Sequence, residues 1–135
     1  MKEDKRFDGW QYPTLEDGVM TKYNWIVQNL DNFKLGYKTD IGAFSYINAK
    51  YGVTIEDYVQ IGSHCSIYSL STIDNQQGEV YLKENCKIGS HSTIMPNVTI
   101  GKNSIVGANS LVLKDIPNNV VAFGVPAKVI RKIDE

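Results

Sequence analysis

The sequence has few of the residues that most often carry catalysis or cross-links. Its 135 residues include two cysteines, two histidines and four prolines, and 14 lysines and arginines nearly balance 15 aspartates and glutamates, for a net charge of −1. Two cysteines make no disulfide framework, and a nearly neutral chain gives no reason to expect nucleic acid or an anionic membrane as a partner. No apolar run reaches the roughly 18–20 residues of a membrane span, and the charged N-terminus lacks a secretory signal. These shortages predict a soluble cytoplasmic protein of one domain.

What the sequence has instead is a period of six residues. Between residues 80 and 113, aliphatic residues recur at every sixth position, and a small or β-branched residue stands two positions before each. The aliphatic positions are Leu82, Ile88, Ile94, Ile100, Val106 and Val112. Neither the 3.6-residue period of a helix nor the two-residue period of a strand fits this pattern. A short fixed period predicts a solenoid, in which each repeat buries its apolar side chain against the next coil.

Four hexads and the end of the chain carry a resemblance to a known family. The hexads begin at Ile88-Gly-Ser-His, Ile94-Met-Pro-Asn, Ile100-Gly-Lys-Asn and Val106-Gly-Ala-Asn, and the chain closes with Gly124-Val-Pro-Ala-Lys-Val-Ile. Together they resemble the hexapeptide-repeat acyltransferases, most closely the sugar, galactoside and maltose acetyltransferases that use acetyl-CoA. The resemblance implies an all-β fold, a left-handed parallel β-helix with three hexads in each triangular coil. It also implies a homotrimer with active sites between neighbouring copies.

On this basis the chain divides into three parts. Residues 1–34 lack the period and are rich in aromatic residues, and we expect them to cap the open end of the β-helix. The alternative is that their aromatic rings contribute to the pocket for a sugar acceptor. Residues 35–117 form the β-helix, with a surface loop at 74–79 where Gly, Asn and Asp favour a turn. Residues 118–135 form a C-terminal tail, because Pro117 removes a backbone donor and ends the ladder.

The register of the coils follows from the step of nine residues between Ile73 and Leu82. If this step is one hexad plus three loop residues, Ile73 belongs to the core and Leu82 stacks in one column with Ile61. In the same register, Cys65 and Cys86 stack on one face as buried, inert thiols. The two histidines, each third after a core isoleucine, are then expected on different faces of one subunit.

The resemblance also implies a binding site for acetyl-CoA. The backbone N–H of Ser90 resembles the group that faces the thioester carbonyl, and the N–H of Ala108 resembles the one that binds the pantetheine arm. The residues that match positions near CoA are Lys114, Pro126, Lys128 and Arg131, with the basic ones placed for the phosphates. No metal is expected, because the zinc-dependent carbonic anhydrase built on this helix needs three His ligands and the chain has two histidines.

The nature of the acceptor is less constrained. In the hydroxyl-acetylating relatives a loop His removes the proton, and Thr72 stands at that position here. A sugar amine, whose pKa lies not far above the roughly 7.7–8 of an α-amino group, needs no strong base, whereas a hydroxyl needs general-base help worth about 10²–10⁴-fold. We therefore expect an acetyl-CoA-dependent N-acetyltransferase that acts on a nucleotide-linked amino sugar for surface polysaccharide, with Asp74 and Asn75 near the amine.

Two alternatives remain at this point. One is a sugar O-acetyltransferase that uses His64 or His91 as the general base, and these two histidines are the candidate catalytic residues. The other is a β-helix without catalytic activity that serves as a scaffold or binding module. Binding of acetyl-CoA would separate the first from the second.

Overall fold

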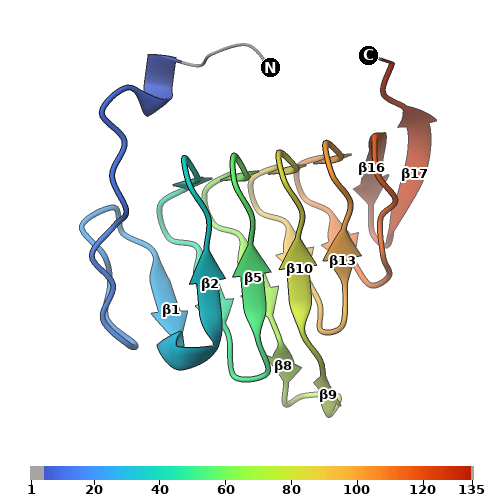
Figure 1. Cartoon of the computed structure of the whole chain (residues 1–135). Coiled ribbons are helices and arrows are strands. Elements are labelled where there is room, and N and C mark those ends of the chain that lie inside the picture. Colours follow the sequence, from blue (N-terminus) through green and yellow to red (C-terminus); the bar gives the residue numbers. More distant parts are fainter. Residues whose placement is uncertain (1–4, 135) are drawn as a thin grey trace.

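The computed structural model describes residues 5–134, in which short parallel strands wind into a β-helix with three sheets (Figure 1). Sheet A contains β1 (Ile26–Gln28), β4 (Tyr46–Asn48), β7 (Ser66–Tyr68), β12 (Thr93–Ile94) and β15 (Leu111–Val112). Sheet B contains β2 (Phe33–Leu35), β5 (Val53–Ile55), β10 (Val80–Leu82) and β13 (Thr99–Ile100). Sheet C contains β3 (Asp40–Ile41), β6 (Gln60–Ile61), β11 (Lys87–Ile88), β14 (Ile105–Val106), β16 (Val120–Gly124) and β17 (Ala127–Lys132). The predicted β-helix is confirmed.

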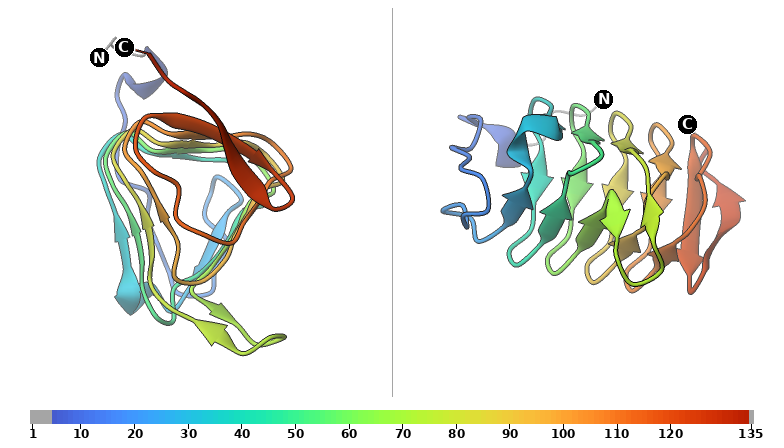
Figure 2. Two further views of the ribbon diagram at one scale, coloured as in Figure 1. Left: turned by 90° about the vertical axis from the view of Figure 1, so that its right-hand side faces the viewer. Right: turned by 90° about the horizontal axis from the view of Figure 1, so that it is seen from below.

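The period of six arises because each hexad makes one side of the triangular coil seen in cross-section (Figure 2). The aliphatic residue of each hexad points inward, and so does the small residue two positions earlier, as alternation along a strand requires. In sheet A, Ile47, Ile67 and Ile94 stack in register and are at most 1% exposed. Full burial of such a side chain stabilises the fold by about 1.5–3 kcal/mol, so the columns of aliphatic residues hold the coils together.

A hairpin interrupts the repeats where the sequence predicted only a short loop. The chain leaves the coil at Ser69, forms β8 (Leu70–Ser71) and β9 (Gln76–Gln77), and returns at Gly78, whose N–H donates to the Ser69 carbonyl at 2.9 Å. Ile73 lies in the turn of this hairpin and is 97% exposed, so its predicted place in the core is wrong. Ile73 stands six residues after Ile67 only by coincidence. The next core position is Leu82, because the step from Ile67 to Leu82 is one hexad plus a nine-residue excursion.

This excursion changes the register of every column that spans it. Ile61 pairs with Ile88 instead of Leu82, which pairs with Ile55 in sheet B. Cys65 consequently precedes a strand of sheet A and Cys86 a strand of sheet C, so the prediction that they stack is wrong.

Their predicted burial is confirmed, since Cys65 is 1% exposed and Cys86 is 0% exposed. Burial raises the pKa of the Cys65 thiol, and it raises the pKa of Cys86 to about 12. A thiolate is therefore strongly disfavoured at both positions, as expected for inert cysteines.

The corner between sheets B and C is held by a ladder of asparagine side chains. Asn85, Asn103 and Asn119 adopt left-handed backbone conformations, with φ between 58° and 65°. Asn is among the few residues that tolerate this conformation. The amide of Asn85 donates to Asn103 at 2.9 Å, and that of Asn103 donates to Asn119 at 3.0 Å.

The two ends of the β-helix are closed differently. At the C-terminal end, β16 pairs parallel to β14 and antiparallel to β17, which completes sheet C. At the N-terminal end, residues 5–25, including the 3₁₀ turn η1 (Lys5–Phe7), cover the first coil, and Trp25 is 3% exposed there. A second 3₁₀ turn, η2 (Leu30–Asn32), links β1 to β2. Strand β1 already pairs with β4, so the coils include residues 26–28, upstream of the predicted start at residue 35. Residues 1–4 of the predicted cap lie outside the described residues.

No helix within residues 5–134 has the length and apolar character needed to cross a membrane.

Candidate functional site

The corner that joins sheet C to sheet A carries four of the ten predicted site residues, and we call it the site corner. It consists of residues 42–45, 62–65, 89–92 and 107–110. We call each of these four segments, which pass from sheet C to sheet A, a crossing. Each crossing begins with a glycine that lies directly against the next coil. A Cβ atom on Gly62 would lie 2.6 Å from the Ser90 nitrogen, and one on Gly89 would lie 2.4 Å from the Ala108 nitrogen. Only glycine allows the coils to approach this closely.

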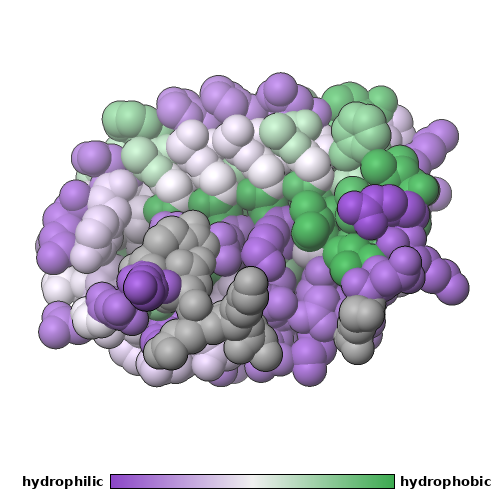
Figure 3. All heavy atoms as spheres, turned by 90° about the horizontal axis from the view of Figure 1, so that it is seen from above, coloured by the Kyte–Doolittle hydropathy of each residue, from purple (hydrophilic) through white to green (hydrophobic). Residues whose placement is uncertain are grey.

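A shallow groove of about 440 Å³ runs over sheet C and onto the site corner. Figure 3 shows the molecule from this side, where weakly polar and apolar residues form rows that run across the coils, with hydrophilic residues on either side. The lining residues that belong to the site corner are Gly62, Gly89, Gly107 and Ala108. Because these residues have little or no side chain, the groove exposes backbone to any bound molecule.

Two backbone N–H groups beside this groove are available for a ligand. The N–H of His91 donates to the Ser63 carbonyl at 3.0 Å, and the N–H of Asn109 donates to the Ser90 carbonyl at 2.9 Å. By contrast, the N–H groups of Ser90 and Ala108 have no acceptor among residues 5–134. These are the two groups that the sequence singled out for the thioester and the pantetheine arm. Preorganised N–H groups of this kind can stabilise a developing oxyanion.

The two histidines lie together at the site corner. Their rings stack with centroids 4.7 Å apart and planes 5° from parallel, and the Phe44 ring contacts His64 with centroids 5.3 Å apart. All three residues have left-handed φ angles of 58–65°. The prediction that the histidines occupy different faces is wrong, because it used the incorrect register across the hairpin. His91 directly follows Ser90, so two imidazoles lie beside the free N–H groups.

Sequence reasoning did not single out Phe44. It stands third after the core residue Ile41, as His64 stands third after Ile61, and this spacing was the signal that could have identified it.

The C-terminal hairpin extends the site corner by one more crossing. Phe123 lies against Gly107, and the Gly124 N–H donates to Ser110 Oγ at 3.1 Å. The turn that follows, between β16 and β17, contains Pro126. Lys128 pairs with Phe123 near this turn, and Arg131 pairs with Val121 further along the strand. Lys128 is therefore paired with the residue that lies against Gly107, whereas Arg131 lies further along β17 from this turn.

Three predicted site residues are not brought to the site corner within one chain. Lys114 follows β15 and lies where sheet A turns toward sheet B. Asp74 and Asn75 lie in the turn of the β8–β9 hairpin, which projects from that same A–B corner (Figure 2). Asp74 accepts a hydrogen bond from the Gln76 side chain. Within residues 5–134 no three His, Cys, Asp or Glu residues are grouped to hold a metal ion.

Comparisons with known proteins agree with the fold. Residues 79–114 match the family described as Bacterial transferase hexapeptide (six repeats). Galactoside O-acetyltransferase of Escherichia coli (strain K12) is 41% identical over 76% of this chain and 58% of that protein. The chain thus spans just over half the length of this relative.

Two solved structures show the fold with ligands bound. A hexapeptide-repeat containing acetyltransferase from Vibrio cholerae, complexed with acetyl coenzyme A, has a TM-score of 0.78 and 26% identity, and the match covers 82% of this chain and 66% of that one. A variant of AntD, an N-acyltransferase from Bacillus cereus in complex with dTDP-4-amino-4,6-dideoxyglucose and coenzyme A, has a TM-score of 0.58 and 26% identity, and the match covers 83% of this chain and 72% of that one.

Proposed function

Because the chain belongs to the bacterial hexapeptide-repeat transferase family, we propose that it transfers an acetyl group from acetyl-CoA to a sugar. The observation that carries this proposal is the pair of free N–H groups on Ser90 and Ala108, one coil apart beside the groove. Two proteins of similar fold were solved with acetyl coenzyme A or coenzyme A bound. The same groups would serve both the thioester and the pantetheine arm here.

The chemistry at the site corner follows from these groups. The acceptor atom forms a bond to the acetyl carbonyl carbon, the carbon–sulfur bond breaks, and CoA leaves as its thiol. The Ser90 N–H donates to the carbonyl oxygen as negative charge develops on it, and one such donor is worth about 10²–10³-fold in kcat. The Ala108 N–H holds the pantetheine arm so that the thioester lies in place. Lys128 and Arg131, on the exposed strand β17, bind the CoA phosphates.

We place the complete site between neighbouring copies of a homotrimer. In that arrangement the β8–β9 hairpin of one copy reaches the site corner of the next and brings Asp74, Asn75 and Lys114 of a neighbour within reach of the acceptor and CoA. The exposed apolar residues support this arrangement, since Ile73 is 97% exposed and Val125 is 72% exposed in the single chain. Ile73 lies in the β8–β9 hairpin and Val125 in the turn between β16 and β17, so a contact between the hairpin of one copy and the site corner of the next would bury both.

For the acceptor, the geometry supports a sugar hydroxyl best. A hydroxyl needs a general base, and His91 stands next to Ser90 with His64 stacked on its ring. We propose that His91 removes the hydroxyl proton and that His64 fixes the orientation of the His91 ring. The 41% identity to a galactoside O-acetyltransferase supports the same acceptor.

The amine of a nucleotide-linked amino sugar, used in surface polysaccharide, is the second candidate. It is favoured by the likeness to AntD, whose structure contains a nucleotide-linked amino sugar, and by Thr72, which cannot act as a base in the hairpin. For this acceptor, positioning alone contributes much of the rate. Asp74 and Asn75 of a neighbouring copy would then hold the amine.

Release of the CoA thiol from acetyl-CoA tests both candidates. Galactosides and glucosides serve as hydroxyl acceptors, and nucleotide-linked amino sugars serve as amine acceptors. The enzymes compared are the wild type, His91→Ala, His64→Ala and Asn109→Ala. Asn109 is the control, because it occupies the same corner position one coil beyond His91. Turnover of hydroxyl sugars with a loss of 10²-fold or more in His91→Ala supports the first candidate. Turnover only of amino sugars, with little loss in either His variant, supports the second, and no binding of acetyl-CoA contradicts both.

A further inference from the structure

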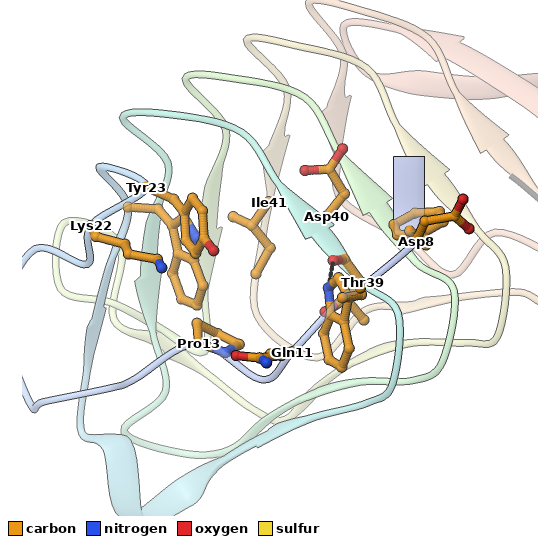
Figure 4. A pocket seen from close by; sticks show the side chains of 12 residues that line it. Asp8, Gln11, Pro13, Lys22, Tyr23, Thr39, Asp40 and Ile41 are labelled. Carbon is orange, nitrogen blue, oxygen red and sulfur yellow. Dashed lines mark hydrogen bonds between the residues drawn. The ribbon is translucent and has the colours of Figure 1, made fainter. Parts of the chain in front are cut away.

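The N-terminal segment encloses a cavity of about 520 Å³ at the open end of the β-helix. Its residues come from the segment 7–25 and from the first strand of sheet C. In Figure 4, Lys22 and Tyr23 lie on one side of the cavity, Thr39 and Asp8 lie on the other, and Gln11 and Pro13 lie between them. The volume falls in the range of small-molecule sites, roughly 300–1,000 Å³.

Hydrogen bonds hold the walls of this cavity in place. The indole Nε1 of Trp10 donates to the Thr39 carbonyl at 2.8 Å, which fixes one wall to the coil. On the other side, the Thr21 N–H donates to the Trp25 carbonyl at 2.8 Å, which closes the loop that carries Lys22 and Tyr23. The Gly18 N–H donates to the Val27 carbonyl at 2.8 Å, which ties the same loop to β1. The cavity is therefore preformed, and ordering it would cost a ligand little free energy.

A cap needs only to cover the core, and this one does more. Trp25 covers the first coil and is 3% exposed, whereas Tyr23, beside the cavity, is 51% exposed. An aromatic ring left half exposed next to a hollow is a surface on which a ligand can pack.

The lining matches the two kinds of surface that a pyranose ring presents. The rings of Trp10 and Tyr23 offer apolar surface for the C–H faces of a sugar. Gln11 and Asp8 add amide and carboxylate groups that can bond hydroxyls. The ionic groups that the described lining contributes are of both signs, from Asp8, Asp40 and Lys22.

We propose that this cavity is a binding site for one uncharged pyranose unit of a glycan, separate from the site corner. It lies in the N-terminal cap, whereas Ser90 and Ala108 lie two and three coils further along the β-helix. The proposal does not depend on acetyl transfer, since the cavity binds the sugar without reacting with it. In a chain that modifies glycans, such a site would hold a second sugar unit of an oligosaccharide.

Both tryptophans of the chain line this cavity, so tryptophan fluorescence reports on it directly. We would titrate the full-length protein with the methyl pyranosides of galactose, glucose and mannose, and record saturation-transfer NMR on the same sugars. At least one pyranoside should change the emission in a saturable way and receive saturation on its ring C–H protons. Tyr23→Ala should weaken this binding about tenfold or more, because it removes an aromatic wall.

Tyr51→Ala is the matched control. Tyr51 is also an exposed tyrosine with the ammonium of the preceding lysine over its ring, 6.0 Å from the centroid, against 5.1 Å for Lys22 and Tyr23. It should bind the pyranoside like the wild type, and thermal unfolding of both variants checks that each is folded. No saturable response to any pyranoside, equal loss in both variants, or displacement of the sugar by a nucleoside diphosphate would overturn the proposal. Sugar binding without CoA thiol release would leave it intact while contradicting the proposed acetyl transfer.

Discussion

Substitution of Gly62 by alanine perturbs the site corner at one defined point. The new Cβ atom would lie 2.6 Å from the Ser90 nitrogen and 2.8 Å from its Cα, and both are backbone atoms that cannot rotate away. Ordinary contact begins at 3.4 Å, so the Ser90 crossing must move by about 0.8 Å, the difference between 3.4 and 2.6 Å. Overpacking of this kind costs about 1–3 kcal/mol, which lowers the melting temperature of a domain of this size by several degrees.

The same displacement moves the N–H that we assign to the thioester oxygen. A shift approaching 1 Å in a positioning group costs about 10²-fold in rate, which agrees with the 10²–10³-fold value of one oxyanion donor. The assays are thermal unfolding by circular dichroism and CoA thiol release at saturating acetyl-CoA. Ser63→Ala is the control, because it lies in the same crossing but adds no atom between the coils. Gly62→Ala with wild-type stability would refute the packing argument, and wild-type kcat in a destabilised Gly62→Ala would refute the role of Ser90.

Three further predictions concern the rest of the β-helix. Ile73→Ser should change the free energy of unfolding of the monomeric chain by less than about 0.5 kcal/mol. Ile67→Ala should lower it by about 2–5 kcal/mol, as measured by urea unfolding. Equal losses in the two variants would show that Ile73 belongs to the core. Burial raises the pKa of Cys86 from 9.0 to about 12, so the protonated thiol's contribution to stability is complete below pH 9 and is lost as pH rises toward 12, by about 1.4 kcal/mol per pH unit. Cys86→Ala should therefore show a flatter fall in stability between pH 9 and 11 than the wild type, and parallel curves would contradict the burial. Asn103→Ala should be less stable than Asn103→Gly by about 1 kcal/mol in the same unfolding assay, because alanine, unlike glycine, is strained at the φ of 65°. The reverse order would show that backbone conformation is not the main effect.

The β-helix could be predicted from the sequence because its core obeys a strict period. Each aliphatic position of a hexad is also a stacking position, so residues such as Ile88 and Val106 identify the fold without any knowledge of contacts. The register could not be predicted across residues 69–78. Ile73 matches the hexad count, and its exposure depends on a hairpin that projects away from the coils. A period of six cannot reveal an excursion when an isoleucine of that excursion stands at the next expected hexad position.

The candidate site, like the fold, could be predicted only where it depends on local sequence. Ser90 and Ala108 could be singled out from the sequence because each follows a glycine that local sequence reveals, and their roles at the thioester and the pantetheine arm stay a prediction. The stacking of His64 on His91 was missed because it depends on the length of the intervening excursion. The cavity in the cap could not be predicted either. Residues 5–25 have no period, and their aromatic rings are as consistent with a cover for the core as with a sugar pocket.

The central claim is that Ser90 and Ala108 present their N–H groups to acetyl-CoA, and amide NMR tests it most directly. We would titrate ¹⁵N-labelled protein with acetyl-CoA and follow the backbone signals of these residues and of Asn85 and Asn119, which lie at the corner between sheets B and C. The proposed site predicts saturable shifts at Ser90 and Ala108 that share one dissociation constant, with little change at the two asparagines. Saturable binding that leaves Ser90 and Ala108 unshifted, or that shifts the asparagines most, would contradict it.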